Sequence, residues 1–71
     1  MNIILLGYGK MGRTIEKIAM NRGHGISARI DIDNQSDLDE AQGDVVIEFS
    51  HPDSAFNNIT KCLLRKLPVV S

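Results

Sequence analysis

The chain is short, mixed in composition and almost neutral. It has 71 residues, of which 42% are hydrophobic, and a formal net charge of −1. A chain of this length buries only ~60% of the surface that its unfolded form exposes, so we expect a small core. The balanced charge disfavours a nucleic-acid-binding module. No apolar stretch is long enough to span a bilayer, and we expect a soluble, cytoplasmic protein with no membrane partner.

The first segment combines a short apolar run with a glycine-rich loop. Residues 2–6 predict a buried strand, and Gly7, Gly9 and Gly12 follow it in the sequence Gly-Tyr-Gly-Lys-Met-Gly. A strand, this glycine spacing and then a helix indicate a dinucleotide-binding loop. The first glycine permits a tight turn, the second a close approach to a pyrophosphate, and the third close helix packing. The pyrophosphate would bind the free N–H groups at the helix N-terminus.

A helix and a second strand are predicted next. Apolar side chains fall at helical spacing at Met11, Ile15, Ile18 and Ala19. Gly23 and Gly25, on either side of His24, end this helix. Residues 26–32 alternate as in a strand, with one face formed by Ile26, Ala28, Ile30 and Ile32. We place His24 in a surface turn, away from the predicted cofactor.

The second half of the chain repeats the alternation of strand and helix. The polar stretch 33–43 is expected to be a loop with one short helical turn at 36–40, capped by Ser36. Residues 44–49 predict a third strand, and Pro52 opens a second helix. The apolar stripe of that helix comprises Ala55, Phe56, Ile59, Leu63 and Leu64. Residues 68–71 predict the start of a fourth strand.

This order predicts an α/β fold with a Rossmann-type parallel sheet and right-handed crossovers. The predicted sheet is incomplete, with the first four strands and two main helices. A parallel sheet is normally covered on both faces, whereas this one would end on an open edge. We therefore expect residues 1–71 to be the N-terminal portion of a dinucleotide-binding domain, without the substrate or tetramerisation domain.

Asp31 is the predicted ribose ligand. It follows Gly12 by 19 residues, near the end of the second strand, where an acid accepts hydrogen bonds from the adenosine ribose. Asp33 is the competing candidate. A carboxylate at the position of Asp31 repels the 2′-phosphate of NADP, so the sequence favours NADH slightly over NADPH. Lys10 and Arg13 flank the phosphate position and would reduce that preference, or are solvated charges at a helix end.

The remaining candidate residues carry weaker signals. His51 follows the third strand and either contacts a cofactor or belongs to the helix entry. Cys62 is the only cysteine, which excludes an internal disulfide, and we expect it in the core. No cluster of metal ligands and no pairing of nucleophile with base is visible in the sequence. We therefore predict neither a metal site nor a catalytic residue in this chain.

Two segments resemble the 4-hydroxy-tetrahydrodipicolinate reductase (dihydrodipicolinate reductase) family. The first is the glycine loop at residues 7–12, and the second is residues 44–52, Asp-Val-Val-Ile-Glu-Phe-Ser-His-Pro, which is similar to the family's D-V-x-I-D-F-[ST]-x-P. Residues 68–71 look like the strand before the family's Gly-Thr-Thr-Gly loop. The resemblance covers nearly the whole chain in order. The segment at 44–52 is more discriminating than the glycine loop.

The resemblance implies an oxidoreductase of lysine and diaminopimelate biosynthesis. Such an enzyme reduces a cyclic dihydrodipicolinate-type dicarboxylate to tetrahydrodipicolinate with NADH or NADPH, as a homo-oligomer, a tetramer by family resemblance. Carried over by position, the cofactor contacts would be Gly7, Tyr8, Gly9, Lys10, Met11, Gly12, Asp31, Phe49 and Ser50. Phe49 and Ser50 would lie near the nicotinamide half, although Phe49 also suits a core position.

The chain departs from the family pattern in two places. Many members have one more residue in the glycine loop, and many have Arg directly after the acid, where this chain has Ile32. The second departure argues against a strong NADP preference. The family's catalytic His and Lys belong to later sequence, so we expect the 71-residue chain alone to be inactive. Two alternatives remain: another small-substrate NAD(P)-dependent dehydrogenase, or a nucleotide-sensing regulatory Rossmann module.

Overall fold

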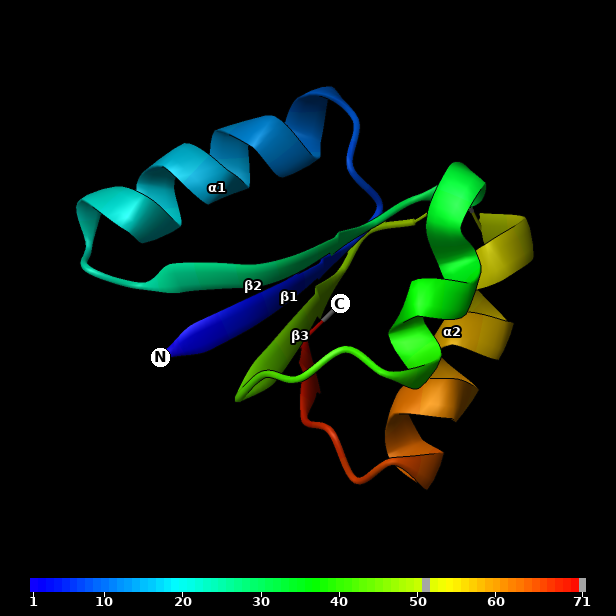
Figure 1. Cartoon of the computed structure of the whole chain (residues 1–71). Helices are drawn as coiled ribbons and strands as arrows, with labels where there is room; N and C mark the ends of the chain where they lie inside the picture. Colours follow the sequence, from blue (N-terminus) through cyan, green and yellow to red (C-terminus); the bar gives the residue numbers. More distant parts are fainter. Residues whose placement is uncertain (51, 71) are drawn as a thin grey trace.

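Four parallel strands form one sheet in the order β2-β1-β3-β4 (Figure 1). The computed structural model describes residues 1–50 and 52–70, without the side chains of Ile32 and of residues 52–54. The elements in chain order are β1 (Asn2–Leu6), α1 (Lys10–Asn21), β2 (Gly25–Ile30), the 3₁₀ helix η1 (Ile32–Asp39), β3 (Val45–Glu48), α2 (Pro52–Leu64) and β4 (Val69–Val70). The predicted α/β class and Rossmann-type sheet are confirmed.

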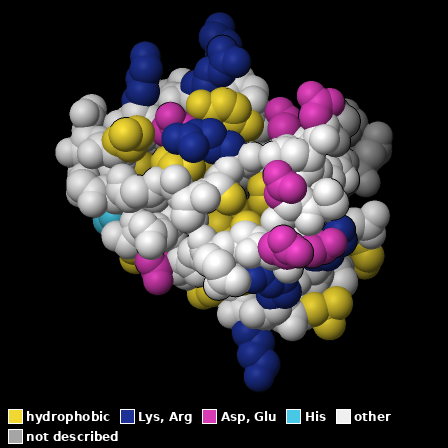
Figure 2. Space-filling view, in the orientation of Figure 1, with side chains coloured by type: hydrophobic (Ala, Val, Ile, Leu, Met, Phe, Trp, Pro, Cys, Tyr) yellow, Lys and Arg dark blue, Asp and Glu magenta, His cyan; other side chains and the backbone are white. Residues whose placement is uncertain are grey.

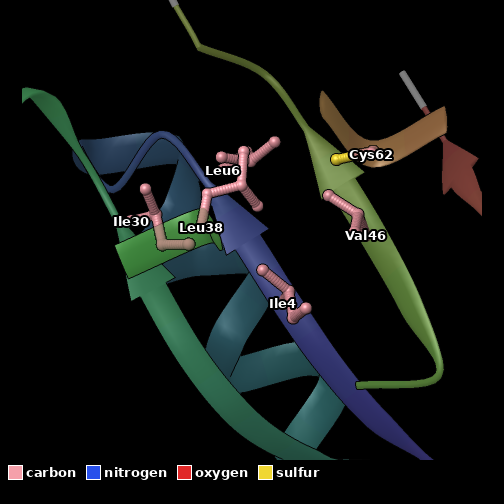
Figure 3. Packing of buried hydrophobic residues seen from close by; sticks show 6 residues of the cluster. All are labelled: Ile4, Leu6, Ile30, Leu38, Val46 and Cys62. Carbon is pink, nitrogen blue, oxygen red and sulfur yellow. The ribbon is translucent and has the colours of Figure 1, made fainter. Parts of the chain in front are cut away.

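Helices cover both faces of the sheet. Ala19 of α1 packs with Ile3 and Leu5 on one face. On the other face, η1 and α2 bury a second cluster made of Ile4, Leu6, Ile30, Leu38, Val46 and Cys62. Figure 3 shows Cys62 pointing at Val46, and Leu38 beside Ile30. The continuous apolar run of β1 follows from this arrangement, because successive side chains of a buried parallel strand enter opposite cores.

The predicted alternation along the second strand is wrong at its first residue. A register shift between Ile3 and Ile4 pairs Ile3 with Ile26 but Ile4 with Ala28. Ser27 is the extra residue, and such a bulge moves the following side chains to the other face. Ile26 therefore packs on the α1 side, whereas Ala28 packs on the α2 side. A bulge depends on pairing with a neighbouring strand, which strand periodicity alone does not reveal.

The predicted apolar stripes of the two helices are only partly buried. In α1, Ala19 and Ile15 pack on the sheet, whereas Met11 and Ile18 are 65% and 50% exposed. Among the described side chains of α2, Asn58 and Cys62 are buried, and Ala55 and Ile59 are half-buried. The exposed apolar residues of α2 are Phe56, Leu63 and Leu64. The polar Asn58 is thus buried, although the hydrophobic pattern predicted apolar residues of this helix in that place.

The polar connection after β2 is more ordered than predicted. The expected single turn at 36–40 is instead part of η1, which runs from Ile32 to Asp39 with a kink at Asn34. Leu38 is fully buried and belongs to the core. One apolar residue among acids therefore fixes this segment over the sheet. Within the described ranges, no helix has the length and hydrophobicity needed to cross a membrane.

Candidate functional site

The predicted site residues meet at the point where the strand order reverses. The chain moves from β1 outward to β2 and then returns across β1 to β3. Ligands of open parallel sheets bind at the carboxyl ends of the strands at such a switch point. There a cavity of about 240 Å³ is lined by Gly7, Tyr8, Gly9, Lys10, Met11, Ile30, Asp31, Gln35, Phe49, Ser50 and Asn58. Residues predicted from three separate segments thus share one cavity.

Two glycines close the contact between the loop after β1 and the end of β3. Gly7 has φ +94°, and a Cβ on it would lie 3.0 Å from the backbone nitrogen of Ser50. A Cβ on Gly12 would lie 2.8 Å from the Gly7 carbonyl oxygen and 3.0 Å from the Phe49 ring. Gly12 therefore stands behind the cavity and allows α1 to approach Phe49. At Gly9 no atom lies within 4 Å of such a Cβ, so that side of the loop is open.

The N-terminus of α1 carries an unusual charge distribution. The first hydrogen bond of α1 runs from the Arg13 N–H to the Gly9 carbonyl, at 3.1 Å. The backbone N–H groups that precede Arg13 therefore have no carbonyl earlier in the helix with which to bond. The first turn contains no acid but includes Lys10 and Arg13. Positive charge at the positive end of a helix is unfavourable unless an anion binds there. In Figure 2, Lys and Arg side chains project from the side of the molecule that carries α1.

Asp31 stands at the mouth of the same cavity, in a turn built by Asn34. The Asp31 N–H donates to Asn34 Oδ1 at 2.7 Å, and the Asn34 N–H donates to the Asp31 carbonyl at 3.1 Å. The Asn34 amide nitrogen also donates to the Arg29 carbonyl at 2.9 Å. The role of Asn34 was not predicted from the sequence. The signal was an Asn three residues past the acid, because Asn side chains often bond nearby backbone groups in turns.

A cationic cluster surrounds Tyr8 beside the cavity. The guanidinium carbons of Arg13 and Arg29 lie 5.8 Å and 5.9 Å from the centre of the Tyr8 ring. Arg29 donates to Glu16 at 2.5 Å, and this hydrogen bond lowers the pKa of Glu16 and raises that of Arg29. The neighbouring Tyr8 shifts the pKa values of both groups in the same directions. Arg29 is thus paired with an acid, whereas Arg13 extends beside the open part of the loop.

A buried polar group lies where β3 ends, next to Gly7, and two of its members line the cavity. This group, made of Glu48, Ser50 and Asn58, is called the Ser50 cluster. Glu48 is 4% exposed and Asn58 is 5% exposed. Glu48 Oε2 accepts hydrogen bonds from the Ser50 N–H, at 2.8 Å, and from the Ser50 hydroxyl. The Asn58 amide donates to Ser50 Oγ at 3.2 Å. Ser50 was predicted to be a site residue, whereas Glu48 and Asn58 were not.

Other predicted residues lie elsewhere. Cys62 is fully buried in the core, as predicted, and burial raises the pKa of its thiol. His24 contacts the amino group of Met1 at the other end of β1, away from the cavity. His51 lies outside the described residues. Among the side chains that the structure describes, no group of three from His, Cys, Asp or Glu could hold a metal ion.

Comparison with known proteins finds a family that matches the segments forming the cavity. The family model described as "Dihydrodipicolinate reductase, N-terminus" matches residues 1–71. A protein of Christiangramia forsetii named 4-hydroxy-tetrahydrodipicolinate reductase is 53% identical over 72 residues, covering 100% of this chain and 30% of the relative. A protein of the same name from Staphylococcus epidermidis is 34% identical over 65 residues, covering 79% of this chain and 27% of the relative.

The match extends over the glycine loop, the turn at Asp31 and the end of β3 together. The match therefore favours this reductase family over the alternatives that the glycine loop alone leaves open, which are another dehydrogenase and a regulatory module. The chain spans about 30% of the length of the curated relatives that it matches. The chain belongs to the dihydrodipicolinate reductase family, whose N-terminal region it matches over residues 1–71.

Proposed function

We propose that this chain is the NAD(P)H-binding part of a 4-hydroxy-tetrahydrodipicolinate reductase. One observation carries the proposal: a single cavity joins the open glycine loop, Asp31 and the end of β3 at the switch point of the sheet. The chain's own residues fit a dinucleotide. The open side of Gly9 leaves room for a pyrophosphate, and the basic first turn of α1 supplies the charge that an anion requires.

Each part of the cavity has a proposed role. The loop residues Gly7 to Gly12 bind the pyrophosphate, with backbone N–H groups of α1 as donors. The Asp31 carboxylate accepts hydrogen bonds from the adenosine ribose. Phe49 and Ser50 lie beside the nicotinamide half. When bound, the reduced nicotinamide supplies a hydride to the substrate.

The proposed cofactor preference is a modest one for NADH. The Asp31 carboxylate would repel a 2′-phosphate, while Arg13 beside Tyr8 would partly offset that repulsion. Arg29 contributes less because it is paired with Glu16. We predict that Asp31→Arg in the complete polypeptide raises the NADPH:NADH affinity ratio by about tenfold or more, on the scale of one charged hydrogen bond. An unchanged ratio would show that Asp31 is not the ribose ligand.

The complete protein is proposed to reduce a cyclic dihydrodipicolinate-type substrate to tetrahydrodipicolinate, in the cytoplasm and as a homo-oligomer. The relatives extend well beyond the matched region. The cavity of about 240 Å³ is also smaller than the ~300–1,000 Å³ of typical ligand pockets. We therefore propose that further sequence supplies the substrate site and additional walls for the nicotinamide.

The test measures cofactor binding and turnover by the complete polypeptide and by the 71-residue chain. Calorimetric titration of the complete polypeptide with NADH should give saturable binding, and turnover should require the dicarboxylate substrate. The 71-residue chain should bind NADH weakly, or not at all, and show no turnover. Absence of cofactor binding by the complete polypeptide would refute the proposed function. Turnover by the 71-residue chain would refute the division of roles.

A further inference from the structure

The Ser50 cluster places a buried acid where the core pattern calls for an apolar residue. Val46 packs on the α2 side of the sheet, and strand alternation puts Glu48, two residues later, on the same side. Asn58, one turn before the core residue Cys62 on α2, is buried as well and donates to Ser50 Oγ. Burying a carboxylate is costly unless hydrogen bonds compensate it. A local departure of this kind is expected at functional sites.

The hydrogen bonds of the cluster fix the direction of the Ser50 hydroxyl. Glu48 Oε2 accepts two hydrogen bonds from Ser50, one from its backbone N–H and one from its hydroxyl. A hydroxyl has one proton and two acceptor lone pairs. The Asn58 amide occupies one lone pair of Ser50 Oγ. One lone pair of Ser50 Oγ remains, so toward a ligand Ser50 can act only as a hydrogen-bond acceptor.

We propose that Glu48 is a positioning residue that, with Asn58, holds Ser50 as an oriented acceptor for a donor group on the nicotinamide half of the cofactor. The inference rests on the proposed function and deepens it. Ser50 and Asn58 line the cavity, whereas Glu48 is buried behind them. Glu48 therefore acts on the cofactor through Ser50. The N–H of the nicotinamide carboxamide is a donor of the required kind.

The test compares two ligands across a double-mutant cycle in the complete polypeptide. NADH carries the nicotinamide half, whereas ADP-ribose lacks the nicotinamide. Calorimetry would give the Kd of both ligands for the wild type, Glu48→Leu, Ser50→Ala and the double variant. Thermal unfolding of each variant would establish that it is folded at the temperature of the titration.

Glu48→Leu should raise the Kd for NADH about tenfold, the scale of one charged hydrogen bond, and leave the Kd for ADP-ribose within about twofold. In the Ser50→Ala background, Glu48→Leu should have no further effect, because the group through which it acts is gone. Equal weakening of both ligands would overturn the proposal, as would an undiminished effect in the Ser50→Ala background. Unchanged NADH affinity in Glu48→Leu would also overturn it.

Asn58→Ala provides a second route if Glu48→Leu does not fold. It should weaken NADH binding about threefold, the scale of one neutral hydrogen bond, and only while Ser50 is present. Asn57→Ala is the matched control, because Asn57 is exposed on the same helix, and it should leave NADH affinity unchanged. Equal effects of the two Asn variants would overturn the proposal. Wild-type protein that binds neither NADH nor ADP-ribose would refute the proposed function itself.

Discussion

The glycine loop and the Ser50 cluster meet where Gly7 approaches Ser50, but these two parts of the site are built by different means. In the glycine loop, backbone geometry forms the site: Gly7 at φ +94°, the open side of Gly9, and the N-terminus of α1. In the Ser50 cluster, side chains form it through hydrogen bonds in a buried setting. A backbone site suits a phosphate, which every dinucleotide contains. A side-chain site suits the groups that distinguish one half of the cofactor from the other.

A methyl group at Gly7 should disrupt the glycine loop most severely. Gly7→Ala introduces a side chain at positive φ and places its Cβ 3.0 Å from the Ser50 backbone. We expect destabilisation of about 2–4 kcal/mol, the sum of a left-handed-conformation penalty and overpacking. Denaturant unfolding of the complete polypeptide measures this change.

Gly9→Ala is the matched control for Gly7→Ala. No atom lies within 4 Å of a Cβ at Gly9, so its stability should stay within about 0.5 kcal/mol of the wild type. Its NADH affinity should nevertheless fall, because the methyl occupies the open side of the loop. Equal destabilisation by the two substitutions would contradict the different roles assigned to these glycines.

Asn34→Ala should sharpen the comparison by loosening the turn that holds Asp31. The substitution removes three hydrogen bonds of the Asn34 side chain, to Asp31, Arg29 and Asp37. Because the site is partly solvated, we expect a loss of about 1–2 kcal/mol in stability. NADH affinity should fall with it, whereas the hydrogen bonds of the Ser50 cluster should be unaffected. Unchanged affinity would show that Asp31 keeps its position without Asn34.

The smallest expected effect is the pH dependence from Glu16. Its pKa is lowered below the ordinary value of 4.5, chiefly by the hydrogen bond from Arg29. A lowered pKa in the folded state means that the contribution to stability is present above pH 4.5 and is lost as the pH falls through the lowered value. Arg29→Gln should flatten this acid limb of the stability curve and leave stability at pH 7 nearly unchanged, because the pair is exposed. A steeper acid limb in the variant would contradict the pairing.

The glycine loop and the Ser50 cluster also differ in how well the sequence predicted them. The roles of Gly7, Gly9 and Gly12 were predictable, because glycines at that spacing between a strand and a helix have few other physical explanations. Glu48 and Asn58 were not, because an acid in a strand and an amide in a helix are ordinary in sequence. Their roles follow only from the side-by-side placement of β3 and α2.

The parallel sheet and its two main helices followed from the alternation of apolar segments. The bulge at Ser27 and the burial of Leu38 did not, because each depends on contacts with residues distant in the chain. Ser27 disrupts the pattern only against β1. Leu38 is a lone apolar residue in a polar stretch, and its burial requires the sheet beneath it.

The most direct test of the central claim is a crystal structure of the complete polypeptide with NADH bound. We expect the pyrophosphate against Gly9 and the first N–H groups of α1, the adenosine ribose on Asp31, and the nicotinamide half beside Phe49 and Ser50. A ribose held by Asp33, or a nicotinamide half that does not approach Ser50, would contradict the roles assigned to the two parts of the site.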